Sequence, residues 1–282
     1  MGTFSYLARR FVAGESIEQA ILAVRTLNVD DLVASLDLLG EDVSNPSQAQ
    51  ATVLEYTRLL EKIACQKINS NVSLKLTQLG LKVSEDFCVS LIRQILQKAW
   101  AHQNFVRIDM EGSQYTERTL NIFYRLFSEF KNVGIVIQAY LYRSENDAIK
   151  LASLKAPVRV CKGAYKEPSS IAFQGMEDIR RNYKILVETL LKSGSKVGIA
   201  THDERLIQWV LDWTQKNQIP KAQFEFQMLY GLRRSRARQL AAMGYIVRTY
   251  VPYGSHWLPY FIRRLRERKE NVLFVLKSLV SD

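Results

Sequence analysis

The residues with the clearest potential for chemistry are two adjacent arginines near the end of the chain, Arg263 and Arg264. They follow the turn-forming residues Pro252 and Gly254, and the pattern predicts a short helix that begins after this turn. In such a helix Tyr260 lies on the same face as both arginines, at the spacing i, i+3 and i+4. Guanidinium groups donate paired hydrogen bonds to carboxylate oxygens, and a ring beside them covers apolar surface. The pattern therefore predicts a site for a small carboxylate with a hydrophobic body, although a solvated basic helix end has the same sequence.

Further polar residues stand at or near the ends of apolar segments, where a buried strand would be expected to be apolar. They are Lys75, Asp109, Gln138, Arg159, Lys162, Thr201, His202, Gln227 and Tyr250. Each has a structural explanation when it is taken alone. Lys75 could lie along the surface with its charge in water, and Asp109 could cap a turn or pair with Arg107. The pair His202-Asp203 could begin a helix.

The elements that would have to position these residues follow a regular alternation. Strand candidates cover residues 32–39, 72–76, 105–110, 133–140, 158–162, 196–201, 224–229 and 245–251. Helix candidates cover residues 16–28, 49–68, 84–100, 116–130, 146–154, 177–192, 203–216 and 234–243. Alternation of this kind implies parallel strands joined by right-handed crossovers, and about eight units over about 250 residues is the size of a (β/α)8 barrel.

An open doubly wound sheet is the alternative fold. It would usually carry a glycine-rich first turn, but the chain has no Gly-x-Gly-x-x-Gly spacing and no Gly-Lys-Ser/Thr phosphate loop. We therefore expect a TIM-type barrel in a single domain over residues 1–282. Within it, residues 1–30 would form an N-terminal helical segment and residues 31–282 the barrel.

In a parallel barrel the polar strand ends meet at one rim, where barrel active sites form. A cluster of charges there is difficult to explain as purely structural, because buried charges are costly unless they are paired or used. Cations outnumber carboxylates among these residues, which indicates an anionic ligand or cofactor. Gly163 would let backbone N–H groups approach a phosphate, and Met110, Val160 and Tyr165 could supply apolar walls.

The composition is that of a soluble globular protein and allows several kinds of partner. The 282 residues are 47% hydrophobic and 24% charged, with a net charge of +11. The longest uncharged run, Thr249 to Ile262, is shorter than the roughly 20 residues of a membrane-spanning helix. Cys65, Cys88 and Cys161 are few and far apart, which indicates a reducing compartment and has no zinc-ligand spacing.

The ordered motifs of the chain resemble those of the proline dehydrogenase family, flavoenzymes with a distorted (β/α)8 barrel. The resemblance covers most of the chain, from Leu38-Leu-Gly-Glu41 to Asn271-Val272. The segments that carry it are Ser73-Leu-Lys-Leu, Arg107-Ile-Asp-Met-Glu, Val136-Ile-Gln-Ala-Tyr, Val158-Arg-Val-Cys-Lys-Gly-Ala-Tyr-Lys, Ile199-Ala-Thr-His-Asp, Phe224-Glu-Phe-Gln-Met-Leu-Tyr-Gly, Arg248-Thr-Tyr-Val-Pro-Tyr-Gly and Tyr260-Phe-Ile-Arg-Arg-Leu. One departure is Lys269-Glu270, where an Arg-Pro pair or similar residues would be expected after the helix; it concerns packing more than chemistry.

The resemblance implies the oxidation of L-proline to 1-pyrroline-5-carboxylate, the first step of proline catabolism to glutamate. Hydride would pass to N5 of a noncovalent FAD, and the electrons would go on to a quinone-type acceptor. It also implies a final helix over the barrel mouth. By motif, the residues expected to bind substrate are Lys75, Val160, Tyr250, Tyr260, Arg263 and Arg264.

The remaining roles follow from the same resemblance. Asp109 and Arg159 are expected to be catalytic, Asp109 beside Tyr250 and Arg159 near the flavin N5. The residues expected to contact FAD are Met110, Gln138, Lys162, Gly163, Ala164, Tyr165, Thr201, His202 and Gln227. We further expect Glu41 to pair with Arg263 as a gate, and Tyr260 to favour proline over hydroxyproline. No metal and no general base are identified.

Two rival interpretations remain open. One is a Schiff-base aldolase that uses Lys75 or Lys162 as the nucleophile. The other is a basic module for nucleic acid or a membrane surface, built on the run from Arg263 to Lys269. Aromatic residues are not interleaved with basic ones as a single-strand platform needs, so we expect no nucleic-acid partner. We expect a cytoplasmic protein, and a quinone acceptor is compatible with peripheral contact at the inner face of the membrane.

Overall fold

Eight short strands form the centre of the molecule. The computed structural model describes residues 10–267, with the side chains described as far as residue 262. The strands are β1 (Val33–Leu38), β2 (Ser70–Leu74), β3 (Val106–Ile108), β4 (Val133–Gln138), β5 (Val158–Cys161), β6 (Val197–Ala200), β7 (Phe224–Leu229) and β8 (Val247–Tyr253). Each pairs in parallel with the next, and β8 pairs in parallel with β1. The sheet is therefore a closed barrel, as the alternation of segments predicts.

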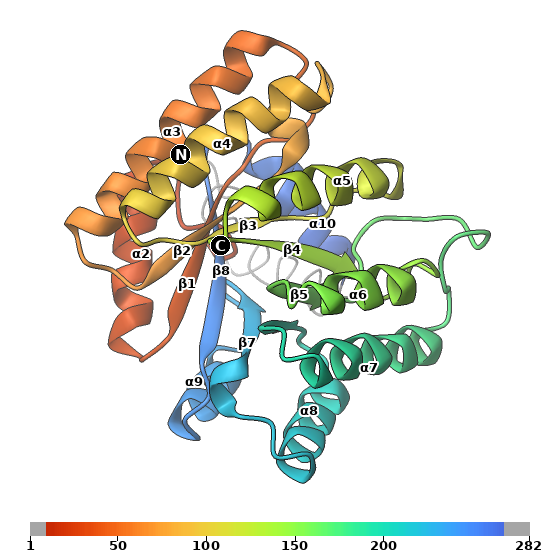
Figure 1. Ribbon diagram of the computed structural model, residues 1–282. Helices are drawn as coiled ribbons and strands as arrows, with labels where there is room; N and C mark the ends of the chain where they lie inside the picture. The colour runs from red at the N-terminus through yellow and green to blue at the C-terminus, as the bar shows by residue number, and fades with distance from the viewer. Residues whose placement is uncertain (1–9, 268–282) are drawn as a thin grey trace, which may run out of the picture.

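Helices surround the barrel on its outside and, in the case of the last one, at its carboxyl end (Figure 1). They are α2 (Ile17–Val29), α3 (Pro46–Cys65), α4 (Glu85–Ala101), α5 (Ser113–Glu129), α6 (Ser144–Ser153), α7 (Met176–Lys192), α8 (Glu204–Lys216), α9 (Arg234–Ala242) and α10 (Trp257–Glu267), with short 3₁₀ turns η1 (Leu76–Gln78) and η2 (Lys221–Gln223). Figure 1 shows β1 and β8, from opposite ends of the chain, side by side where the barrel closes. Among the described residues, no helix is long and apolar enough to cross a membrane.

The helix starts have local causes in the sequence. Ser16 and Gln19 form a capping box at the start of α2, and both residues can be read from the sequence at the required spacing. Ser84 caps α4 by accepting a hydrogen bond from the N–H of Phe87. Helix α3 begins at Pro46 rather than at residue 49, because Asn45 caps it and proline is well suited to the first helical position.

The core lies between the barrel and its helices. The outward-facing residues of the strands are fully buried, and they include Val72, Ile108, Val160 and Ile199. This burial on both faces is typical of parallel sheets. The largest fully buried side chains outside the strands include Tyr56 on α3 and Tyr183 on α7. Each donates a hydrogen bond from its hydroxyl to a strand carbonyl, so each helix is fixed to the barrel by a polar contact as well as by apolar packing.

Helix α10 packs against the carboxyl end of the barrel. Tyr260 and Phe261 are buried in a cluster with Phe11 and with Leu39, which directly follows β1. Tyr250 of β8 packs against the same cluster. The final helix therefore lies over the barrel mouth, as expected. The side chain of Ile262, next to Phe261 in the same helix, is 37% exposed.

Candidate active site

The interior of the barrel is polar, and Arg159 on β5 lies at its centre. Its Nη1 donates to Oδ1 of Asp109, after β3, at 2.7 Å, and its Nη2 donates to the Ser73 hydroxyl on β2 at 3.2 Å. Its Nε donates to the side-chain oxygen of Gln227 on β7. These partners stand on strands that do not neighbour β5, so the hydrogen bonds must cross the interior. The Arg159 side chain is 7% exposed, and its charge is compensated by Asp109.

Asp109 joins this arginine to the aromatic wall. Its second oxygen, Oδ2, accepts a hydrogen bond of 2.8 Å from the hydroxyl of Tyr250 on β8. The Arg159 guanidinium also lies 5.3 Å from the centre of the Tyr250 ring, within cation–π range. Burial and the negative field of Asp109 raise the pKa of Tyr250, so the phenol stays protonated and acts as a donor. The contact expected between Asp109 and Tyr250 is therefore present, whereas the alternative pairing of Asp109 with Arg107 is not the one formed.

Lys75 enters the same interior from the end of β2. Its ammonium donates to both oxygens of Asp37 on β1, each at 2.8 Å. The side chains are 9% and 0% exposed, so the ion pair is shielded from water. Burial by itself would lower the pKa of Lys75, but the attraction of Asp37 and Asp109 outweighs it and raises the pKa. Lys75 is thus a buried cation, and the alternative of a surface lysine does not apply.

A second polar layer lies beneath this one. Glu225 of β7 pairs with Arg248 of β8 at 2.7 Å, and it accepts a hydrogen bond from the Gln227 amide nitrogen at 2.5 Å. Gly198 of β6 makes room for this amide, since a Cβ at that position would lie 2.5 Å from the Gln227 nitrogen. Gln227 therefore connects Glu225 in the lower layer to Arg159 in the upper one. These two hydrogen bonds fix the orientation of the Gln227 amide.

The ends of β5 and β6 carry another group of expected site residues. Lys162 pairs with Asp203 at 2.9 Å, and Arg180 of α7 donates to the same carboxylate oxygen at 2.7 Å. Burial alone would raise the pKa of Asp203, but hydrogen bonds from these two cations lower it to about 2. Asp203 also caps α8, which agrees with the structural explanation that His202-Asp203 begins a helix. Thr201 accepts a hydrogen bond from the Asp203 N–H at 3.1 Å and thereby orders the turn.

His202 and Gly163 complete this side of the rim. The His202 ring accepts a hydrogen bond at Nε2 from the Leu229 N–H, at 3.0 Å, which fixes the imidazole beside the end of β7. Gly163 has φ of +114°, and a Cβ there would lie 2.4 Å from the ring of Tyr140. Any residue other than glycine would be strained at this position. The backbone between Lys162 and Ala164 therefore carries no side chain and is accessible to a ligand.

The other expected residues are not all brought together. Gln138 at the end of β4 and Met110 after β3 are buried at the same rim. Val160 alternates with Arg159 along β5, so its side chain faces the helix layer, away from the interior. The prediction that Val160 walls a substrate ring is wrong for this side chain. Arg263 and Arg264 belong to α10, but their side chains lie outside the described part of the chain, and so does the expected contact of Arg263 with Glu41.

Sequence reasoning missed several interior residues. Asp37 was included in an apolar run, although Ser35 and Asp37 stand two residues apart and share the inner face of β1. Ser35 contacts Ser73 at 3.0 Å between their hydroxyl oxygens. The signal that could have revealed all three is polar residues at every second position of β1 and β2.

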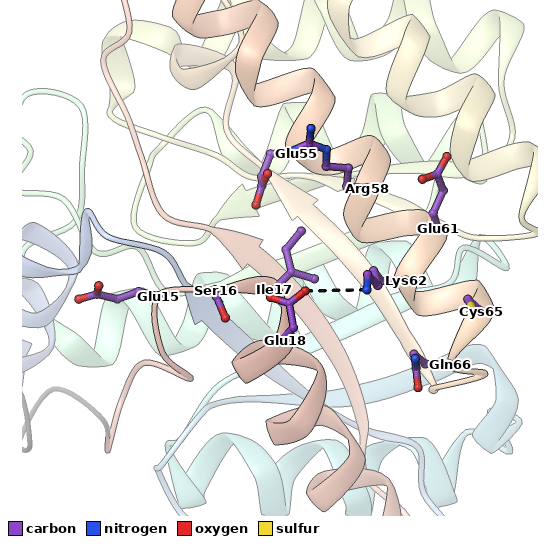
Figure 2. A pocket seen from close by; sticks show the side chains of 10 residues that line it. All are labelled: Glu15, Ser16, Ile17, Glu18, Glu55, Arg58, Glu61, Lys62, Cys65 and Gln66. Carbon is purple, nitrogen blue, oxygen red and sulfur yellow. Dashed lines mark ion pairs between the residues drawn. The ribbon is translucent and has the colours of Figure 1, made fainter.

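A cavity also lies on the outside of the barrel. It is a groove of about 560 Å³ on the outer surface between α2 and α3, shown in Figure 2. Glu18 and Lys62 face each other across it at 3.8 Å, and Glu55 and Cys65 also line it. None of the described residues that line this groove is an expected site residue, so it is not the site at the barrel mouth.

A closed (β/α)8 barrel with polar and charged side chains at the carboxyl ends of its strands has the arrangement of a barrel enzyme. The family model for proline dehydrogenase matches residues 20–277. The chain belongs to the proline dehydrogenase family and is an oxidoreductase of proline metabolism.

Individual relatives agree with this assignment. Proline dehydrogenase 1 of Bacillus subtilis (strain 168) is 42% identical over 273 residues, which cover 97% of this chain and 90% of that protein. Proline dehydrogenase of Deinococcus radiodurans is 42% identical over 279 residues, with the same shares covered.

Among solved structures, proline utilization A from Bdellovibrio bacteriovorus, inactivated by N-propargylglycine, superposes with a TM-score of 0.87 at 26% identity. The match covers 93% of this chain and 32% of that one, so this chain spans about a third of the longer protein.

Proposed function

We propose that the protein oxidises L-proline to 1-pyrroline-5-carboxylate with noncovalent FAD and passes the electrons to a quinone-type acceptor. The observation that carries the proposal is the network around Arg159, which joins β2, β3, β5, β7 and β8 in a chain of this family. The positive charge of Arg159 would suit an electron-accepting cofactor, and that of Lys75 would suit the carboxylate of an amino acid.

The substrate's carboxylate would be held by Lys75 together with Arg263 and Arg264. Lys75 is buried and protonated, so it can donate a strong hydrogen bond to an anion. The two arginines are adjacent on α10, the helix that packs over the barrel mouth through Tyr260 and Phe261. Tyr250 and Tyr260 would cover the pyrrolidine ring, and Tyr260 would crowd a hydroxyl on that ring and so favour proline over hydroxyproline.

The donors at the rim suit FAD. The side-chain oxygen of Gln138 is buried and has no hydrogen-bond partner among the described residues, so a donor from a ligand would satisfy it. The backbone N–H groups around Gly163 and the charge of Lys162 suit the binding of a pyrophosphate group. The charge of Arg159 suits a flavin ring, which gains negative charge on reduction. Met110, Ala164, Tyr165, Thr201, His202 and Gln227 are the other residues proposed to hold it.

FAD, when bound, would supply the two-electron acceptor for the hydride, at its N5. The residues of this chain bind, orient and shield the reactants. Hydride leaves the ring carbon beside nitrogen while the nitrogen lone pair forms the imine, so the amine must be unprotonated at that moment. Arg159 is fixed by three side chains and is 7% exposed, so its charge stabilises the developing anion without reorganising. Helix α10 would exclude water from the mouth.

The rival reaction through a Schiff base is disfavoured by the state of both candidate lysines. A nucleophilic lysine must be a neutral amine. Lys75 keeps its proton through Asp37, and Lys162 is paired with Asp203. Lys75 therefore lacks the low pKa that such chemistry requires, and Lys162 is held in an ion pair with a carboxylate.

Glu41 is proposed to act as a gate by pairing with Arg263 when proline is bound. It follows β1 at the barrel mouth, the end against which α10 packs. Replacing Glu41 by alanine should raise the KM for proline and leave kcat nearly unchanged. An unchanged KM would exclude the gate. A quinone acceptor would be compatible with a cytoplasmic enzyme that touches the inner face of the membrane peripherally.

A turnover assay tests the proposed function. The purified protein with FAD, L-proline and a soluble quinone analogue should form 1-pyrroline-5-carboxylate, measured as its coloured adduct with an aromatic amino aldehyde. Borohydride added during turnover should leave the mass of the protein unchanged. A protein whose mass increases by the reduced substrate, with no product formed, would support the aldolase instead.

A further inference from the structure

Asp37 is a fully buried carboxylate that contacts Lys75, a residue proposed to bind substrate. The sequence motifs assign no role to Asp37. It stands on the inner face of β1 with 0% exposure. Both of its oxygens accept hydrogen bonds from Lys75 at 2.8 Å. A carboxylate costs much free energy to bury unless it is paired and used, so a precise function is expected of it.

The geometry of the ion pair leaves one donor of Lys75 available. An ammonium group has three N–H bonds. Two of them are directed at Asp37, which removes most of the rotational freedom of the group. The direction of the third is thereby set by Asp37. A lysine held in this way presents one charge-assisted donor in a fixed direction, as a substrate carboxylate requires.

Asp37 also lies beside the hydroxyl group of Tyr250, which donates a hydrogen bond to Asp109. In the pairing of β1 with β8, Ser35 is opposite Tyr250, and Asp37 is one inner-face position further toward the barrel mouth. Burial raises the pKa of Asp37, and the charge of Lys75 and a hydrogen bond from the Tyr250 hydroxyl oppose this rise, so Tyr250 acts on both carboxylates. Asp37 therefore touches two of the groups proposed to bind substrate, one on each neighbouring strand.

We propose that Asp37 is a positioning residue for substrate binding: it keeps Lys75 protonated and aims its remaining N–H at the carboxylate of the amino acid. This inference rests on the proposed function. The simpler alternative is that Asp37 only compensates a buried charge for the stability of the fold. The two differ in one respect, because only the first makes ligand affinity at alkaline pH depend on Asp37.

Among the described residues, four charged or titratable groups have the clearest effect on Lys75. They are Asp37 on β1, Asp109 after β3, Glu111 beyond it, and Tyr165 after β5. Burial disfavours the ammonium, and Asp37 is the strongest of the groups that favour it. Removing the charge of Asp37 should therefore lower the pKa of Lys75, so that the proton is lost within an accessible alkaline range.

The test is the inhibition constant of tetrahydrofuran-2-carboxylate for the FAD-loaded enzyme. This proline analogue has a ring oxygen in place of the amine, so it does not titrate in the range studied. In wild type, the constant should change less than about twofold between about pH 7.5 and 9.5, because Lys75 stays charged. In Asp37→Asn it should rise about tenfold or more over the same range, since each pH unit above a pKa costs up to about tenfold in the charged form. Parallel profiles for the two proteins would overturn the inference.

Matched variants separate this effect from others. Asp42→Asn removes a carboxylate just beyond β1 that pairs with Lys82 at the surface, at 2.7 Å, and should keep the wild-type profile. Asp37→Glu restores the charge and should move the alkaline rise back toward wild type. If Asp37→Glu behaves as Asp37→Asn does, Asp37 does not act through its charge, and the inference fails.

A double-mutant comparison covers the case in which Asp37→Asn does not fold. Asp37→Asn combined with Lys75→Gln leaves no buried charge in the pair. It should bind the inhibitor as weakly as Lys75→Gln alone, because Asp37 acts through Lys75. A further loss of more than about threefold would contradict this. If wild type does not turn over proline, the proposed function fails; if it does and the profiles are parallel, only the inference about Asp37 fails.

Discussion

Replacing Asp109 by asparagine tests the interior network most sharply. The change keeps the size of the side chain and removes its charge. The side-chain oxygen of asparagine can still accept a hydrogen bond from Arg159. Its amide nitrogen would then face the Tyr250 hydroxyl, which would have to rotate its hydrogen away in order to accept a hydrogen bond. The buried guanidinium of Arg159 would have lost its counter-charge.

The expected cost follows from burial and from the contacts that remain. Removing one partner of a buried ion pair costs about 3–5 kcal/mol of the free energy of unfolding. Arg159 keeps its hydrogen bonds to Gln227 and Ser73, and asparagine retains one acceptor. We therefore expect Asp109→Asn to lower the free energy of unfolding by about 2–3 kcal/mol.

Urea unfolding at pH 7 measures this value from the midpoint and slope of the transition. Asp86→Asn is the matched control, because Asp86 pairs with Arg125 at 2.8 Å but is 87% exposed. That change should cost less than about 0.5 kcal/mol. If Asp109→Asn cost no more than the control, the charge of Arg159 would not depend on Asp109, and the proposed arrangement of the network would be wrong.

Two further predictions concern the rim. Gly163→Ala should lower both stability, by about 2 kcal/mol or more, and FAD content, because φ is positive and the Cβ would meet Tyr140. Gly194→Ala has positive φ but no atom within 4 Å of the Cβ, so urea unfolding and flavin absorbance should show the smaller loss there. Asp203→Asn should cost about 1 kcal/mol at neutral pH. Its folded-state pKa is lowered to about 2, so the wild-type advantage should persist above about pH 4 and vanish as pH falls toward about 2 in urea titrations.

The barrel could be predicted from the sequence because each of its signals is local. Parallel strands buried on both faces have nearly continuous apolar runs, and caps such as Ser16 and Ser84 mark the helices between them. The polar exceptions at Asp109 and Arg159 stood out against those runs. Their meeting at one rim follows from the parallel order of the strands.

The details that sequence could not supply depend on which face a residue occupies and on which partner it meets. Val160 was expected in the site, yet it cannot share the inner face with its neighbour Arg159. Asp37 was hidden in an apolar run, and its partner Lys75 lies 38 positions away in the chain. Such pairings arise from strand register, which no short motif encodes.

The most direct test of the account is the visible spectrum of the purified protein under anaerobic conditions. We predict a bound flavin band that bleaches on addition of L-proline and is unaffected by D-proline. A protein that binds no flavin, or whose flavin band is unchanged by L-proline at saturating concentration, would contradict it.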